Sequence, residues 1–457
     1  MPTVDPATDP PVVPPADQPA AVRNEQVLSR QLSSAQQTMM ALGGAIGTGL
    51  FLLSGLAVRV AGPAVIVSYL IVAGISLLLG RALSQMAVAH PTAGAFGVYA
   101  ELYLSPLAGY AVRVSYWAIE VIATGAQLVA ASIYMQFWFP DVPGPVWGFG
   151  FAAILLYLNS RAVGRLGAVE YWLVMIKLVA VVLFVGTAVL FVVGATGRPA
   201  IGLQHVTDGG FVPFGGAGIW LGCCFALYSF IGIEIVGVTS GEAADPGRTI
   251  PRAVRRLVFG LSAIYLVTIT LLTALIPWQR LGVDRSPFVT ALSSLGIPAA
   301  AGVMNFVVLI AALSSANANL YLISRTLFSL ARAGYAPREL GAVNRRNTPV
   351  NALLASGIGL GAAVLVQVGW PDTAYEKLVG VSLFGALFVW LMIFATHIAF
   401  RPTARPIGSY LGAAALVAIL VSTLWVPGLE ATLATGAPWL LLLVIGYVVS
   451  RRKKQRA

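Results

Sequence analysis

Three ionisable side chains lie within or beside glycine-containing apolar stretches of this sequence: Glu120, Lys177 and Glu234. A charged group at such a position is costly, so it is protonated, paired or in contact with water. Lys177 lies about eight residues into its stretch, where a desolvated amine is a candidate for binding and releasing protons. The alternatives are a static pair between Lys177 and Glu120, or a lysine side chain that reaches the membrane surface.

No other group of residues has the spacing of a catalytic or metal-binding motif. Cys223 and Cys224 are adjacent, which disfavours a disulfide between them, and the histidines lie far apart in the sequence. The apolar stretches contain no paired aspartates, no HExxH run and no GxxxxGKS/T nucleotide loop. We therefore expect no metal, no cofactor and no enzymatic activity, and we expect an ion gradient to supply the energy.

The composition indicates which elements must hold these residues. Of the 457 residues, 58% are hydrophobic and 10% are charged, whereas soluble proteins have about 45–50% and about 25%. So few charged residues cannot cover the surface of a chain this long in water. This excludes a soluble enzyme, a nucleic-acid-binding protein and a disordered chain. It predicts an all-α polytopic membrane protein.

Hydropathy divides the chain into about twelve membrane-length segments. They lie near 37–58, 63–88, 107–138, 145–159, 169–193, 217–238, 256–277, 300–329, 350–368, 375–399, 409–426 and 437–450. Before them, the Pro-, Asp- and Ala-rich composition of residues 1–22 predicts a disordered tail over 1–30. The rest divides into a core of ten segments over 31–406, two additional helices over 407–450 and a basic tail over 451–457.

The basic residues orient these segments in the membrane. The chain has 28 basic and 17 acidic residues, a net charge of +11. If the N-terminus is cytoplasmic and the segments alternate in direction, about 20 basic residues lie in cytoplasmic segments and about five lie outside. This bias predicts that both termini are cytoplasmic. The charge then reflects topology and attraction to membrane lipids, with no need for nucleic acid as a partner.

Two segments contain glycines that disfavour a continuous helix. The first has four glycines from Gly43 to Gly49, and each costs about 1 kcal/mol in a helix. The sixth has Gly232 two residues before Glu234. Interrupted backbone at membrane depth is tolerated where it lines a cavity or is buried in protein. The ends of the half-helices can bind both charges of a zwitterion such as an amino acid. The alternative is that the glycines only permit close helix packing.

The first and sixth positions of these segments match an inverted repeat of five segments plus five, here about 31–195 and 210–406. Four motifs resemble amino acid permeases of the amino acid–polyamine–organocation superfamily, and among them the bacterial amino acid transporter branch. The motifs are GGAIGTGLF at 43–51, EYWLVMIKL at 170–178, SFIGIE at 229–234 with SGEAADPGRTIPRAV at 240–254, and SANANLY at 315–321 with ARAGYAP at 331–337.

The resemblance implies the leucine-transporter fold, alternating access and a bacterial inner-membrane location. It implies a substrate site made of main-chain groups at both interruptions, with amides for the carboxylate and carbonyls for the α-amino group. The amides map to Gly47, Thr48 and Gly49, and the carbonyls to Ile46, Tyr228 and Ile231. Tyr228 also stands where relatives have an aromatic side chain that closes over the substrate.

The resemblance also implies roles for the buried charges. In sodium-coupled relatives a sodium ion lies between the first and eighth helices. In some proton-coupled relatives a lysine of the fifth helix occupies that place, and Lys177 matches it. Glu234 matches an acid implicated in gating in a related arginine/agmatine exchanger. With Glu120, these residues are the candidates for proton coupling or gating.

Together these observations predict a secondary active transporter that imports an amino acid by proton symport. The alternative is an exchanger of one amino acid or amine for another. Nothing resembles a channel filter, and two interrupted helices favour a closed binding site. The candidates for reading the substrate side chain are Gln127, Ala226, Asn317, Asn319 and Ser382. Because no clear acidic cluster is visible apart from Glu120, we favour neutral substrates.

Overall fold

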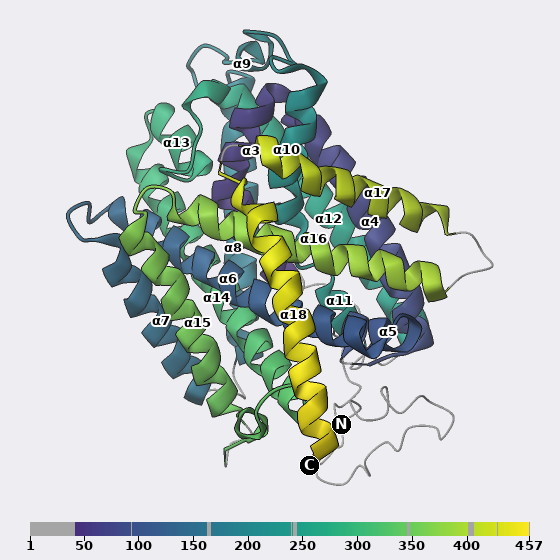
Figure 1. The fold of residues 1–457 in the computed structure, drawn as a ribbon. Coiled ribbons are helices and arrows are strands. Elements are labelled where there is room, and N and C mark those ends of the chain that lie inside the picture. The colour runs from purple at the N-terminus through teal and green to yellow at the C-terminus, as the bar shows by residue number, and fades with distance from the viewer. Residues whose placement is uncertain are drawn as a thin grey trace, which may run out of the picture.

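The computed structural model describes residues 42–92, 94–161, 166–238, 240, 245–344, 348–400, 406–426 and 428–456. The regular structure of these residues is entirely helical, with no strand (Figure 1). Ten of the described helices are long and apolar enough to cross a membrane. The prediction of an all-α polytopic membrane protein is therefore confirmed. The expected N-terminal tail, 1–30, lies outside the described residues.

The ten candidate spans and the twelve expected segments differ in how two regions are counted. The first candidate span, Leu42–Ala89, contains two of the expected segments. A turn at η2 (Gly62–Ala64) separates α3 (Ser54–Ala61) from α4 (Val65–Ala89) within it. The second region is α7 (Gly144–Arg161), which is helical as expected but falls outside the candidate spans. Because α7 has only 18 residues, a membrane-length window cannot leave out its polar C-terminal end. With both regions counted, twelve segments are present in the described residues.

The other membrane-length helices overlap the predicted segments, although one of them begins at Pro246, ten residues before the expected 256. They are α6 (Pro106–Gln136), α8 (Leu166–Val192), α10 (Gly215–Phe230), α12 (Pro246–Leu275), α14 (Pro298–Arg332), α15 (Val350–Gly369), α16 (Ala374–Phe400), α17 (Ile407–Ser422) and α18 (Ala431–Arg456). Short helices join them: α5 (Ala95–Tyr103), α9 (Gln204–Thr207), α11 (Ile235–Val238) and α13 (Pro287–Ser294). α18 continues through the basic residues that were expected to form a tail.

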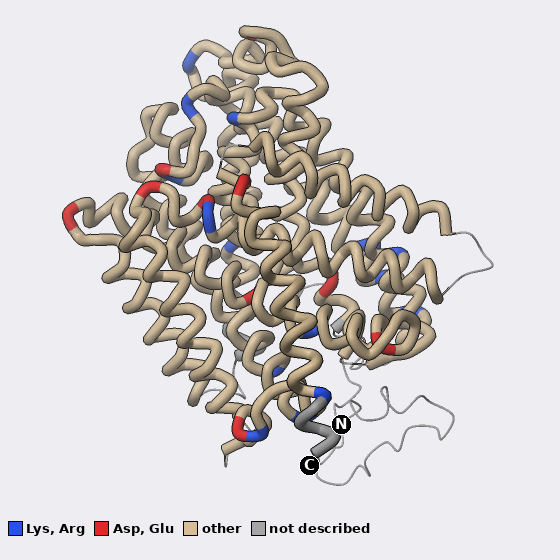
Figure 2. Tube along the Cα trace, viewed as in Figure 1, with Lys and Arg blue, Asp and Glu red and all other residues tan. Residues whose placement is uncertain are grey.

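The centre of the bundle is formed by α6, which packs against α14 and α16, and by α4, which packs against α10 and α12. Lys, Arg, Asp and Glu are sparse in this central region (Figure 2). Charged residues at mid-depth would carry a desolvation cost, so their scarcity agrees with a membrane-embedded bundle. The few charged residues that remain there are candidates for a functional role.

The last two helices are attached to the outside of this bundle. α17 packs against α16 and α4, and α18 packs against α16 and α6. The Trp220 indole of α10 donates to the Ser422 hydroxyl at 2.7 Å, and the Trp439 indole of α18 donates to the Ser115 hydroxyl at 3.0 Å. These polar contacts fix both helices to the core, while their remaining surfaces stay largely exposed, as lipid-facing helices do.

Candidate functional site

The first segment is interrupted at Ile46 and Gly47, within the glycine-rich stretch. Residues 42–45 are helical, and the helix resumes at Thr48 and continues into η1 (Gly49–Leu53), a π-helical turn. The first turn of a helix leaves amide groups without partners inside that helix. Of the three amides expected to bind a carboxylate, those of Thr48 and Gly49 lie in this first turn, whereas the Gly47 amide donates to the Ala45 carbonyl at 3.1 Å.

Two glycines at this interruption are required by the close approach of other helices. A Cβ at Gly47 would lie 2.8 Å from the Oγ of Ser315 in α14, and a Cβ at Gly49 would lie 3.0 Å from the Cα of Ser229 in α10. A larger side chain would force these helices apart. Both interpretations of the glycines therefore apply, because they interrupt the helix and also permit close packing.

The sixth segment is interrupted between α10 and α11, where residues 231–234 form turns. Gly232 has a φ of +110°, a backbone conformation that residues with a side chain rarely adopt. The carboxylate of Glu234 accepts hydrogen bonds from the Gly232 amide at 3.0 and 3.1 Å and from the Trp390 indole of α16 at 3.3 Å. Glu234 therefore stabilises the turn. Both predicted interruptions are present.

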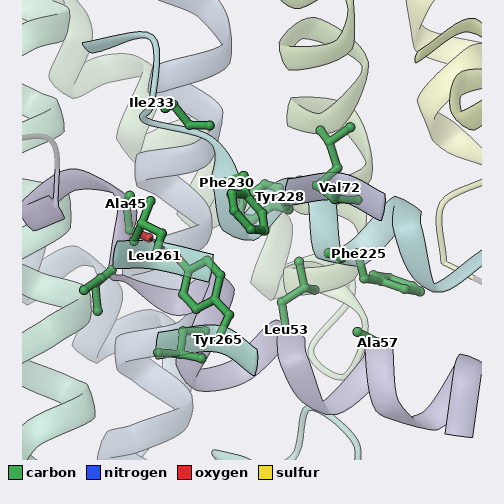
Figure 3. Packing of buried hydrophobic residues seen from close by; sticks show 14 of the residues in the cluster. Ala45, Leu53, Ala57, Val72, Phe225, Tyr228, Phe230, Ile233, Leu261 and Tyr265 are labelled. Atoms are coloured by element: carbon green, nitrogen blue, oxygen red, sulfur yellow. Dashed lines mark hydrogen bonds between the residues drawn. The ribbon is translucent and has the colours of Figure 1, made fainter. Parts of the chain in front are cut away.

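Tyr265 of α12 joins the two interruptions, and Figure 3 shows its ring near Ala45. Its hydroxyl donates to the Ser229 carbonyl at 2.6 Å and lies 3.4 Å from the Ala45 carbonyl. The Ser229 hydroxyl is in turn 3.1 Å from the Tyr69 hydroxyl of α4. Neither tyrosine could be identified from the sequence, because a tyrosine in an apolar helix has the same pattern as an ordinary packed aromatic.

Lys177 is completely buried, and its amine lies between the first segment and α14. Its Nζ donates to the Gly43 carbonyl at 3.0 Å and to the Ser315 Oγ at 3.4 Å. That Oγ is itself 3.2 Å from the Gly43 carbonyl and 3.4 Å from the Ile46 carbonyl. The amine thus lies between the first and eighth segments, where the resemblance implied it, and does not reach the membrane surface. Ser315 belongs to a recognised motif but was not among the predicted site residues.

Two buried polar atoms near the first interruption have no hydrogen-bond partner among the described residues: Thr48 Oγ1 and Gln127 Oε1. Gln127, on α6, faces the interruption, because a Cβ at Gly47 would lie 3.9 Å from its Nε2. The Tyr375 hydroxyl of α16 donates to the Thr48 carbonyl at 3.4 Å. An unsatisfied buried polar group costs about 1–3 kcal/mol. These atoms therefore mark a place where a polar ligand would gain hydrogen bonds.

The remaining substrate-site candidates have different surroundings. The hydroxyl of Tyr228 lies beside Ser382 of α16, and the carbonyl of Tyr228 accepts a hydrogen bond from the Ile231 amide at 3.3 Å. A carbonyl has a second lone pair, so this bond leaves it able to accept another. Asn317 instead accepts a hydrogen bond from Asn159 of α7 at 2.8 Å. Asn317 therefore joins α14 to α7.

A narrow cavity lies between α6, the second interruption and α16. Its walls include Tyr116 and Glu120 from α6, Glu234 from the interruption and Trp390 from α16. Both glutamates are buried. Glu120 therefore shares its surroundings with Glu234, an arrangement that the sequence did not suggest, because the two residues belong to segments far apart along the chain.

Membrane-length helices around two interrupted segments, with buried charges and unpartnered polar atoms at the interruptions, define a polytopic membrane transporter. Comparison with known proteins gives the particular family. The chain belongs to the amino acid permease family of the amino acid–polyamine–organocation superfamily, and the family's sequence model matches residues 36–457.

Individual relatives agree with this assignment. The uncharacterized amino acid permease YtnA of Bacillus subtilis (strain 168) is 34% identical over 442 residues, covering 93% of this chain and 96% of the relative. The aromatic amino acid transport protein AroP of Escherichia coli (strain K12) is 34% identical, with the same coverage of both chains. AroP of Salmonella typhimurium (strain LT2) is 33% identical. These proteins are named as transporters, which confirms the prediction of a permease rather than an enzyme.

Proposed function

We propose that this protein imports an amino acid across a bacterial inner membrane by proton symport and alternating access. The observation that carries the proposal is the buried amine of Lys177, which donates to the Gly43 carbonyl. That carbonyl lies in the short helix that ends at the first interruption, close in sequence to the amides that we propose bind the carboxylate. A protonated lysine amine has three donors, so loss of its proton changes the hydrogen bonds at the interruption. Proton binding and substrate binding then act on one element.

The substrate site combines main-chain groups of both interruptions. The carboxylate would bind the amides of Gly47, Thr48 and Gly49, at the positive end of the resumed half-helix. The α-amino group would bind main-chain carbonyls at the two interruptions, for which the candidates are those of Ile46, Tyr228 and Ile231. The unpartnered oxygens of Thr48 and Gln127 support this location, because the Thr48 hydroxyl can donate to a carboxylate and the Gln127 oxygen can accept from an ammonium group.

Aromatic amino acids are the first substrates to test. The AroP relatives are named for aromatic amino acid transport, and the substrate class favoured from the sequence is neutral. Stabilisation of the purified protein by each of the common amino acids, measured as a shift in unfolding temperature, would identify the ligand. A ligand present at 100 times its Kd should stabilise the folded state by about 2.7 kcal/mol.

Transport in liposomes distinguishes symport from exchange. Purified protein should accumulate the identified amino acid, supplied with a radiolabel, when an inward proton gradient is imposed across empty vesicles. A protonophore should abolish accumulation. Uptake that ignores the gradient but requires the unlabelled amino acid inside the vesicles would contradict symport and establish exchange. Vesicles without protein provide the background.

A further inference from the structure

The narrow cavity between α6 and α16 contains two carboxyl groups that coupling through Lys177 does not require. Glu120 is 5% exposed and Glu234 is 2% exposed, and both line this cavity. One belongs to a continuous helix and the other to the second interruption. A proton bound by the two carboxyl groups would therefore lie between the continuous helix α6 and the interrupted sixth segment.

The surroundings of this carboxyl pair are well defined. The Gly232 amide and the Trp390 indole donate to the Glu234 carboxylate, at 3.0–3.1 Å and 3.3 Å respectively, which fixes its orientation. Among the described residues, the hydroxyl of Tyr116 on α6 shares the cavity wall with the pair, and the hydroxyl of Tyr228 on α10 lies near Glu120. The Tyr116 hydroxyl is buried without a hydrogen-bond partner.

The cations on the neighbouring helices are engaged at other places. Lys177 of α8 donates to the Gly43 carbonyl. Arg113, which lies on α6 with Glu120, forms an ion pair with Glu101 of α5 at 3.1 Å. α16 contributes apolar side chains and Trp390 to the cavity wall. The described lining residues thus offer the pair hydrogen-bond donors but no cation.

Two ionised carboxylates facing one buried cavity repel each other strongly, because the low local dielectric leaves their charges unscreened. Two carboxyl groups in this position avoid the repulsion when one of them keeps its proton. We propose that Glu120 and Glu234 share one proton and form a second proton-binding site, separate from Lys177. One carboxyl group of the pair is then neutral, and the two groups together carry a single negative charge.

This site extends the proposed function, on which its role in transport rests. Glu234 holds the turn at Gly232 through the same carboxylate. Loss of the shared proton adds a negative charge beside that turn and repels Glu120, so proton release should loosen the contact between α6 and the second interruption. The existence of the site can be tested without transport.

Infrared difference spectroscopy of the purified full-length protein tests the shared proton directly. Proton–deuterium exchange should reveal a carbonyl-stretch band of a protonated carboxylic acid near neutral pH. Glu120→Gln should abolish the band, and Glu234→Gln should abolish or shift it, because each substitution removes a carboxylate whose repulsion keeps the proton on the other. Glu101→Gln is the matched control, since its carboxylate is paired with Arg113, and it should leave the band unchanged.

Trp390→Phe provides a second test should Glu234→Gln fail to fold. This variant removes one donor to Glu234, so the band should shift in frequency. Lys177→Ala should retain the band even where it abolishes proton-driven uptake, so the two proposals can fail separately. Two outcomes would overturn the shared proton. In the first, neither glutamate substitution changes the band. In the second, Glu120→Gln abolishes the band but Glu234→Gln and Trp390→Phe leave it unchanged. A band abolished by adding arginine or lysine would also overturn it, because the pair would then bind a substrate cation.

Discussion

The amine of Lys177 and the hydroxyl of Ser315 contact carbonyl oxygens that an unbroken helix would pair internally. Lys177 reaches the Gly43 carbonyl, and Ser315 lies within hydrogen-bond distance of the Gly43 and Ile46 carbonyls. Each contact satisfies a main-chain group at the interruption and also places a proton donor beside the expected carboxylate site. In the proposed mechanism, the stability of the interruption and proton coupling therefore depend on the same atoms.

Lys177→Ala should abolish the dependence of uptake on the proton gradient. The substitution removes a buried donor to the Gly43 carbonyl, and a hydrogen bond to a charged group contributes about 1.5–3 kcal/mol. We expect gradient-driven accumulation in liposomes to fall by more than about tenfold. Lys377→Ala, which removes a lysine near Trp370 outside the interruptions, is the control. If Lys177→Ala retained full gradient-driven accumulation, the lysine would be structural only.

Gly47→Ala should impair transport through crowding. The added methyl group would lie 2.8 Å from Ser315 Oγ, and overpacking of this kind costs about 1–3 kcal/mol. We expect reduced substrate binding, measured by the ligand-induced shift in unfolding temperature. Gly150→Ala is the matched control, since a methyl group there meets nothing within 4 Å. Equal binding by both variants would show that the close approach at Gly47 is not needed.

The helices themselves were predictable because twenty-residue apolar runs have one stable form in a bilayer. The glycines of 43–49 also indicated the first interruption correctly. The contacts between elements were not predictable in this way. Tyr265 and Trp390 bind a main-chain and a carboxylate group of other segments, and Tyr69 contacts the Ser229 hydroxyl. Nothing in the local pattern of these residues distinguishes them from packed aromatics. The short helices α5 and α13 were missed for a related reason, because neither is long enough to give a membrane-spanning signal.

Tyr265→Phe should loosen the connection between the two interruptions. It removes the hydroxyl that donates to the Ser229 carbonyl, and loss of a donor to a buried acceptor costs about 1–3 kcal/mol. The Ala45 carbonyl keeps its hydrogen bond from the Gly47 amide. Thermal unfolding in detergent should therefore occur at a lower temperature than for the wild type. Tyr410→Phe, on the exposed side of α17, should not change it. Identical unfolding of the two variants would refute a joining role for Tyr265.

At the scale of the whole molecule, the charge distribution predicts a single orientation in the membrane. Thr196 follows the fifth predicted segment and should face the outside, whereas Arg338 follows the eighth and should face the cytoplasm. Both side chains are exposed. Thr196→Cys should react with a membrane-impermeant maleimide in intact cells, and Arg338→Cys should react only after permeabilisation. The wild type, whose two thiols are buried, gives the background. The reverse labelling pattern would contradict the proposed topology.

The central claim is that amino acid and proton enter together, and simultaneous flux of both tests it most directly. Liposomes containing the protein and an internal pH-sensitive dye, with the membrane potential clamped by potassium and valinomycin, receive labelled substrate on the outside without an imposed pH gradient. Under proton symport, substrate entry acidifies the lumen in parallel with uptake of the label. Uptake of the label with no change in internal pH would contradict proton symport.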